Sequence, residues 1–231
     1  LYTKQLQYEK PSLLSRSIEE IQQFVRYYIS DKKPNIIGIT STTISYIPAT
    51  KIAKAAKEAD PKAIVAIGGV HVTFMAHETL NECPWIDIVV RGEGERPIFE
   101  LAQGKPLSQI QGISYRQNGQ IIDNPYGPLL SPEEIPIPAY DMLDMRNYAY
   151  VVLMCTRGCP HNCTFCELPS VHGRGIRCRP ADKISQELEL ALSLNSKLEI
   201  RYEDEFMGLF PERTKQVLEL ITQLYRIIFL I

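Results

Sequence analysis

Four cysteines lie within twelve residues of the chain, at Cys155, Cys159, Cys163 and Cys166. The last three have the spacing C-x3-C-x2-C. Thiolates this close in sequence suit a soft metal ion or an iron–sulfur cluster better than a disulfide that stabilises a fold. If three cysteines hold a 4Fe–4S cluster, one iron keeps an open coordination position, which chemistry at a metal requires.

A structural zinc site is the alternative interpretation of these cysteines. Such a site usually takes its ligands from two separated pairs, and no second pair follows here, because the next cysteine, Cys178, stands alone. Zinc would therefore need Cys155 as a fourth ligand. We expect Cys155 instead to be a small, partly buried residue at a strand end, Cys178 to be a bystander and His161 to fill the loop.

The cysteines follow an apolar run at residues 148–154, which predicts a buried strand. A loop after such a strand is a common place for an active site in α/β proteins. The pattern after the loop predicts a helix over 182–194, a strand over 197–205 and a helix over 211–225.

The first hundred residues predict a parallel, doubly wound sheet, because strands alternate with helices. A capping-box pattern, Ser17 with Glu20, opens the first helix. We expect strands at residues 35–40, 63–69 and 86–91, and further helices at 48–59, 77–82 and 97–101.

Three loops of this region follow the carboxyl ends of strands, where open parallel sheets bind ligands. Hydroxyl groups after the first strand can satisfy polar groups of a ligand, and glycines after the other two let a large ligand approach the backbone. From the residues alone, ligand binding and plain tight turns explain these loops equally well. The candidates are Thr40, Ser41, Thr42, Thr43, Gly68, Gly69, Gly92, Glu93 and Gly94.

Composition narrows the classes further. A net charge of −2 with mixed signs gives no electrostatic case for a nucleic-acid or membrane-surface partner, and apolar stretches such as residues 226–231 are too short to span a bilayer. Six cysteines, most of them clustered, suit a reducing cytosol, so we expect a cytoplasmic protein. Leu1 in place of Met, and an apolar last segment, indicate a chain cut at both ends.

Residues 157–166, Arg-Gly-Cys-Pro-His-Asn-Cys-Thr-Phe-Cys, resemble the cluster loop of radical S-adenosylmethionine (radical SAM) enzymes. The resemblance implies that Cys159, Cys163 and Cys166 ligate a 4Fe–4S cluster, that SAM chelates the fourth iron and that Phe165 lies against the adenine. Reduction of the cluster would then cleave SAM to a 5′-deoxyadenosyl radical.

Two later segments are similar to parts of the same family. Arg177 and Arg179 stand in its segment before the first barrel helix and are candidates to meet a carboxylate of SAM or substrate, with solvated basic residues as the alternative. Glu203 and Asp204, followed by Phe206, match its acidic strand end, where one acid hydrogen-bonds the methionyl ammonium of SAM. The sequence leaves open which acid does so. Because only the first units of the barrel are present, we expect this chain alone not to turn over.

Three pieces of the first half resemble, in order and spacing, the cobalamin-binding domain found ahead of many radical SAM domains: residues 34–41, 66–73 and 87–95. The resemblance implies that the nucleotide tail of cobalamin inserts near the first two candidate loops, and that the corrin lies close to the third. The D-x-H-x-x-G signature of many cobalamin proteins is absent from residues 1–231, which leaves the lower axial ligand undetermined. His71 and His77 are expected in surface or turn roles.

These resemblances predict an α/β chain in three parts: a Rossmann-like, parallel-sheet cobalamin-binding domain (1–104), a proline-rich linker with a type I′ hairpin at Asn118-Gly119 (105–147), and a partial radical SAM (β/α) barrel (148–231). The implied cofactors are a 4Fe–4S cluster, SAM and cobalamin. The implied function is methyl transfer to an unactivated carbon of a small-molecule or peptide substrate, with a flavodoxin or ferredoxin as electron donor. One alternative uses the same cofactors to form a ring or rearrange carbon, as in anaerobic porphyrin-ester cyclases, and another is a non-catalytic iron–sulfur or cobalamin-binding module.

Overall fold

The computed structural model describes residues 17–204 and 209–225 of the 231-residue chain. By their contacts these residues form two compact units. The N-terminal unit contains residues 17–129 together with 165–172, and the C-terminal unit contains residues 130–164 and the described residues from 173 onward.

A five-stranded sheet forms the centre of the N-terminal unit, in the order β1-β2-β3-β4-β5. The first three strands are parallel, as predicted, and the hairpin of the last two runs antiparallel to β3. The strands are β1 (Ile36–Thr40), β2 (Ile64–Gly68), β3 (Ile88–Val90), β4 (Ile113–Gln117) and β5 (Gln120–Asp123).

Helices cover both faces of this sheet. Neighbouring residues of a strand point to opposite faces, so Val65 and Ile67 pack with α3, α4 and α5, whereas Ala66 of the same strand packs with Leu101 of α6 and with Ile110. The predicted doubly wound arrangement is therefore present. The helices of the unit are α2 (Ile18–Lys32), α3 (Tyr46–Ala59), α4 (Val70–Phe74), α5 (Ala76–Glu82), α6 (Glu95–Ala102), η2 (Leu107–Gln109) and α7 (Leu168–His172).

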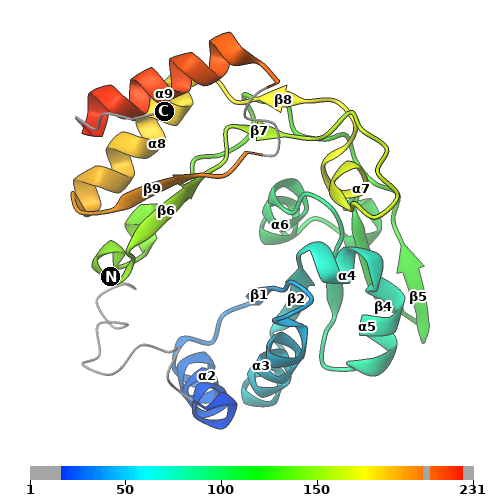
Figure 1. The fold of residues 1–231 in the computed structure, drawn as a ribbon. Helices are drawn as coiled ribbons and strands as arrows, with labels where there is room; N and C mark the ends of the chain where they lie inside the picture. Colours follow the sequence, from blue (N-terminus) through cyan, green and yellow to red (C-terminus); the bar gives the residue numbers. More distant parts are fainter. Residues whose placement is uncertain (1–16, 205–208, 226–231) are drawn as a thin grey trace. The chain divides into compact units, whose positions relative to one another are not determined.

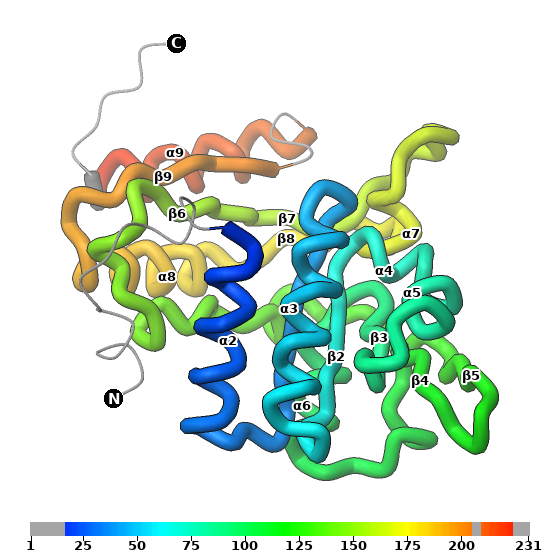
Figure 2. Tube along the Cα trace, turned by 90° about the horizontal axis from the view of Figure 1, so that it is seen from below, coloured from blue at the N-terminus to red at the C-terminus, as the bar shows by residue number. Residues whose placement is uncertain are grey.

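A local sequence signal explains where α2 begins. The predicted capping box opens α2, because the amide of Glu20 donates to Ser17 Oγ (3.2 Å) and the amide of Ser17 donates to Glu20 Oε2 (2.9 Å). Figure 2 shows α2 beside α3, to which Arg26 is joined by an ion pair with Glu58 (2.9 Å).

The β4–β5 hairpin turns at Asn118 and Gly119, with φ of +51° and +78°. Two positive φ values in sequence are the type I′ geometry that this dipeptide predicts. The hairpin was predicted as part of the linker (105–147). It is instead part of the sheet, because Ser114 and Tyr115 pair with Val89 and Ile88.

The C-terminal unit contains two strand–helix units, as the pattern after residue 148 predicted. Its strands β6 and β9 are parallel. Tyr150 pairs with Glu199 at one end, and Leu153 pairs with Tyr202 at the other. Figure 1 shows α8 and α9 together along this pair, where Ile184, Leu188, Val217 and Ile221 form a core with Leu153. The elements are η3 (Tyr140–Met142), η4 (Met145–Asn147), β6 (Tyr150–Leu153), β7 (Thr156–Arg157), β8 (Arg177–Cys178), α8 (Ala181–Leu194), β9 (Glu199–Tyr202) and α9 (Pro211–Tyr225).

In the part of the chain that the structure describes, no helix is long and apolar enough to cross a membrane.

Candidate functional sites

The three candidate loops of the N-terminal unit meet at the carboxyl edge of its parallel strands. The amide of Ser41 donates to the carbonyl of Gly68 (2.9 Å), which joins the loops after β1 and β2. The amide of Gly92 donates to Thr73 Oγ1 (3.0 Å), which joins the loop after β3 to α4. The predicted residues 40–43, 68–69 and 92–94 therefore gather at one place, which we call the sheet-edge site.

Close packing explains part of the glycine pattern in the sheet-edge site. Gly69 has φ +106°, and a Cβ there would collide with the carbonyl oxygen of Ser41. Gly92 also has a positive φ (+72°), whereas side-chain atoms added at Gly68 and Gly94 would only make ordinary contacts with Val90. The tight-turn alternative thus accounts for Gly69 and Gly92 without a ligand.

One polar group of the sheet-edge site remains for a ligand. The Ser41 side chain is buried (2% exposed), and its hydroxyl has no hydrogen-bond partner among the described residues. Buried polar atoms are normally paired. This hydroxyl is therefore available to a polar group of a ligand at the edge formed by the loops after β1 and β2.

We expect Gly69→Ala to lower the free energy of unfolding of the N-terminal unit by about 3 kcal/mol or more. Strain of a side-chain residue at this φ costs of order 1–3 kcal/mol, and the collision with Ser41 adds to it. Gly38→Ala in β1 is the matched control, because a Cβ there meets nothing within 4 Å. Urea unfolding followed by the fluorescence of Trp85 measures both, and equal effects would contradict the packing argument.

The histidines near the sheet-edge site have polar protein partners and lie in α4 (His71) and α5 (His77), not in turns. His71 Nδ1 lies 3.2 Å from Thr43 Oγ1, and His77 Nε2 lies 2.6 Å from Asp123 Oδ2. Burial raises the pKa of Asp123, but hydrogen bonds from Ser114 and His77 outweigh it, so the pKa is lowered overall.

The third loop of the sheet-edge site also contacts α7, the helix that follows Cys166. Glu93, with a side chain only 6% exposed, lies 3.2 Å from His172 Nδ1 through its Oε1. A Cβ at Gly92 would lie 3.7 Å from the carbonyl oxygen of Val171. Sequence reasoning did not find this contact, since no local pattern links residues 79 positions apart.

The two ends of the cysteine loop, residues 158–176, are held together by a short pair of strands. We call these paired ends the root of the loop. Thr156 and Arg157 of β7 pair antiparallel with Cys178 and Arg177 of β8. The amide of Cys159 donates to the carbonyl of Gly173 (3.1 Å). Gly158 has φ +91°, and a Cβ there would collide with the carbonyl oxygen of Gly175. Only glycine therefore allows the two ends of the cysteine loop to approach this closely.

All six cysteines are free thiols. Cys159 is buried, Cys166 is half-buried and Cys163 is exposed. In residues 17–204 and 209–225, no three His, Cys, Asp or Glu side chains are placed so as to hold a metal ion, so the predicted ligands are not brought together. Three free thiols on one loop are nevertheless the donor type that an iron–sulfur cluster requires. Phe165, predicted to lie against adenine, is 89% exposed.

Cys155 differs from these three cysteines. Its side chain is fully buried beside Leu153 and Ile184 in the core of the C-terminal unit. Burial, and then the nearby carboxylate of Asp204, raise the pKa of the Cys155 thiol to about 12. Cys155 is therefore a core residue, buried more deeply than the partly buried position at a strand end that was expected.

The structure separates the two acids at the end of β9. Asp204 Oδ1 accepts hydrogen bonds from the amides of Cys155 (2.7 Å) and Thr156 (2.9 Å), and Oδ2 accepts one from the Tyr202 hydroxyl (2.7 Å). Glu203 is exposed. Phe206, the third residue of the predicted motif, lies outside the described residues.

The two candidate arginines also differ. Arg179 is 4% exposed and forms an ion pair with the buried carboxylate of Glu187, while Nη1 donates to the carbonyl of Met154 (2.9 Å). Arg179 is therefore neither solvated nor directed at an incoming carboxylate, contrary to both expectations. Arg177 is half-buried and donates to the carbonyl of Leu130 (2.7 Å).

The structure defines an α/β protein with three loops gathered at the carboxyl edge of a parallel sheet and a cysteine loop on a second βα region. Residues 12–102 match the family model described as B12 binding domain. An uncharacterized methyltransferase of Pyrococcus horikoshii is 39% identical over 190 residues, which cover 78% of this chain and 41% of the relative. Anaerobic magnesium-protoporphyrin IX monomethyl ester cyclase of Rubrivivax gelatinosus is 32% identical over 181 residues, 72% of this chain and 32% of the relative. The chain thus spans less than half the length of these relatives.

Two solved structures share the fold. The radical SAM methyltransferase TsrM of Kitasatospora setae, with cobalamin and a [4Fe-4S] cluster bound, has a TM-score of 0.69 at 18% identity, covering 89% of this chain and 44% of that chain. The cobalamin-dependent SAM radical enzyme OxsB, with aqua-cobalamin and SAM bound, has a TM-score of 0.68 at 22% identity, covering 90% and 31%. The chain therefore carries a B12-binding domain, and its resemblance to radical SAM proteins that contain such a domain is confirmed.

Proposed function

We propose that this chain is part of a cobalamin-dependent radical SAM enzyme that transfers a methyl group to an unactivated carbon. The observation that carries the proposal is the cysteine loop, which presents Cys159, Cys163 and Cys166 as free thiols from a root closed by β7 and β8. With SAM bound, a reduced 4Fe–4S cluster on these thiols would donate the electron that cleaves SAM to methionine and a 5′-deoxyadenosyl radical, and cobalamin would supply the methyl group.

The sheet-edge site is the proposed cobalamin site. The unpaired Ser41 hydroxyl suits the polar nucleotide tail. Exposed apolar side chains nearby suit a large ring, since Ile44 is 95% and Ile47 is 60% exposed where the chain leaves β1 and enters α3. The proposed residues are Thr40, Ser41, Thr42, Thr43, Gly68, Gly69, Gly92, Glu93 and Gly94.

For SAM, the proposed residues are Phe165, Glu203 and Arg177. Phe165 and Glu203 are exposed and can reach a ligand. Glu203 is preferred over Asp204 for the methionyl ammonium, because both oxygens of Asp204 accept hydrogen bonds within the protein. Arg179 is left out, because its guanidinium is paired with Glu187.

Methyl transfer is preferred because the Pyrococcus relative is named a methyltransferase. The similarity to the magnesium-protoporphyrin ester cyclase favours ring formation as the second candidate. A small-molecule or peptide substrate, a flavodoxin or ferredoxin as electron donor, and a cytoplasmic location complete the proposal. The six free cysteines support the reducing compartment.

Anaerobic reconstitution with iron and sulfide, followed by electron paramagnetic resonance of the reduced protein, tests the proposal. We expect a 4Fe–4S signal that changes when SAM is added, because one iron lacks a protein ligand. A visible-absorption titration with hydroxocobalamin tests the sheet-edge site in the same sample. Stoichiometric zinc without iron would contradict the enzyme. A cluster signal indifferent to SAM would favour the non-catalytic module if Cys155→Ser then loses iron, and a SAM site that needs later barrel strands if Cys155→Ser keeps it.

A further inference from the structure

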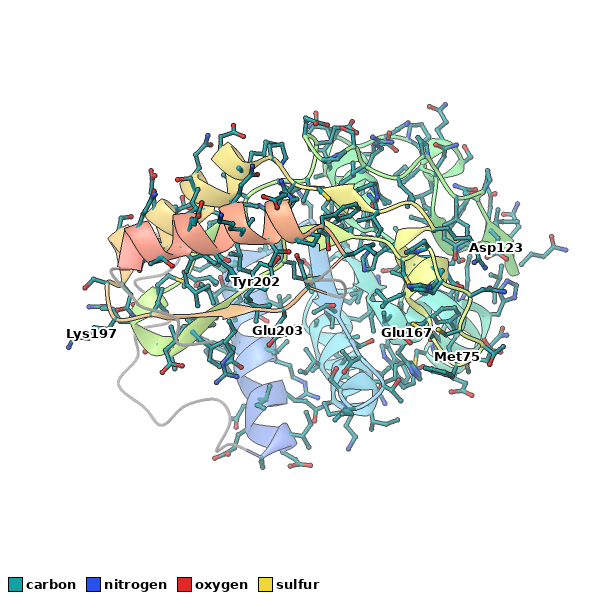
Figure 3. All side chains as sticks on the ribbon, turned by 45° about the horizontal axis from the view of Figure 1, so that its top comes forward. Met75, Asp123, Glu167, Lys197, Tyr202 and Glu203 are labelled. Carbon is teal, nitrogen blue, oxygen red and sulfur yellow. The ribbon has the colours of Figure 1, made fainter. Side chains whose placement is uncertain are left out.

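Asp204 lies where two parallel strands end side by side. Because Leu153 pairs with Tyr202, the residues that follow β6 and β9 leave the sheet at the same edge. Figure 3 shows Tyr202 and Glu203 at this end of β9, with Lys197 at the far end. Residue 204 can therefore reach the chain between β6 and the cysteine loop.

That stretch of backbone, residues 154–156, connects β6 to β7 and includes Thr156, the first residue of β7. Cys155 and Thr156 are buried, and the amide of each donates to Asp204 Oδ1. A buried amide without a partner is costly. One oxygen thus holds two consecutive amides just before the loop starts.

The carbonyl groups of the same stretch are held by Arg179. Its backbone amide donates to the carbonyl of Cys155 (2.9 Å), and its guanidinium donates to that of Met154 (2.9 Å). Arg179 is in turn held by Glu187, which accepts a hydrogen bond from the Tyr140 hydroxyl (3.0 Å). Asp204 therefore binds two amides of this stretch, and Arg179 binds two of its carbonyl groups, one through its guanidinium and one through its backbone amide.

We propose that Asp204 is a positioning residue, whose carboxylate fixes the root of the cysteine loop through the amides of Cys155 and Thr156. The position of these amides sets where the backbone enters the loop, and Cys159 follows three residues after Thr156. This role rests on the proposed function in one respect only, namely that the cysteines of the loop are the cluster ligands. It assigns the two neighbouring acids to different tasks, with Asp204 facing the protein and Glu203 facing solvent.

Two substitutions of Asp204 separate geometry from charge. Asp204→Asn keeps an oxygen at the position of Oδ1 and removes the charge, whereas Asp204→Glu keeps the charge and displaces it by one methylene. Glu203→Gln is the matched control at the next residue. Amide hydrogen exchange of Cys155 and Thr156, measured by NMR in the full chain without added iron, reports the two hydrogen bonds directly.

We expect Asp204→Glu to speed exchange at these two amides by about tenfold or more relative to amides in the core of α8. Asp204→Asn should stay within about threefold of the unchanged protein, and Glu203→Gln should have no effect. A merely structural role would raise exchange throughout the unit and would not favour Asn over Glu. Protected amides in Asp204→Glu, or loss of protection in Asp204→Asn, would overturn the proposal.

The same variants, reconstituted with iron, give a second readout. If Asp204 instead pairs with the ammonium of SAM, Asp204→Asn will abolish the effect of SAM on the resonance signal while the cluster remains, and that result would also overturn the proposal. We expect Asp204→Asn to keep the effect and Glu203→Gln to weaken it. If the unchanged protein takes up no iron, the proposed function fails, but the exchange rates still decide the role of Asp204.

Discussion

Replacing Arg179 by methionine is expected to lower the free energy of unfolding of the C-terminal unit by about 3–5 kcal/mol. Glu187 is 3% exposed, and the substitution would leave its carboxylate buried without a counter-charge. The carbonyl of Met154 would lose a hydrogen-bond donor as well. Urea unfolding followed by circular dichroism measures the loss.

Two controls make this result specific. Arg177→Met removes a half-buried arginine two residues away, for which we expect a loss nearer about 1 kcal/mol. The double variant Arg179→Met with Glu187→Leu removes both charges and should recover part of the stability, because no unpaired charge remains. Equal losses for Arg177→Met and Arg179→Met, or no recovery in the double variant, would contradict the buried ion pair.

The second large effect concerns the proposed cluster ligands. Each of Cys159→Ser, Cys163→Ser and Cys166→Ser is expected to abolish the reconstituted 4Fe–4S cluster, because a hydroxyl is a poor ligand for iron in such clusters. Iron and sulfide content and the resonance signal measure the loss. Cys163 is exposed, so its replacement should leave the folded protein otherwise unchanged.

Cys155→Ala and Cys178→Ser are the matched controls for the cysteine series. We expect both to keep the cluster, since Cys155 is buried in the core of the C-terminal unit and Cys178 lies in β8, outside the motif. If folded Cys155→Ala lost its iron, a fourth protein ligand would be present, and the open position that SAM requires would not exist.

Sequence alone predicted those parts of the fold that local chemistry encodes. The capping box at Ser17 and the turn at Asn118 depend on residues two or three positions apart, and both were found as expected. The membership of the hairpin in the first sheet was not predicted, because it depends on pairing of β4 with β3 across the chain. The short helix α4 was also missed, since five residues give too little periodicity to recognise.

The same limit applies to the sites. The cysteine spacing is a local pattern and could be interpreted from sequence, whereas the roles of Arg179 and Asp204 could not. Asp204 meets Cys155 49 positions away, and the charge pair of Arg179 with Glu187 depends on how α8 packs against the loop root. Arg179 and Asp204 lie near a cofactor motif in the sequence and were therefore expected to contact a ligand. In the structure both instead bind backbone groups of the protein.

The contact of α7 with the loop at Glu93 bears on how such proteins can be recombined. The chain leaves the C-terminal unit after residue 164, contributes residues 165–172 to the N-terminal unit, and returns at residue 173. A fragment cut out at residue 148 would carry Val171 and His172 without the partners they have here. A chimaeric protein in which the B12-binding region is exchanged with that of a relative must therefore include the segment from Phe165 to His172. Without that segment the exchanged region lacks α7.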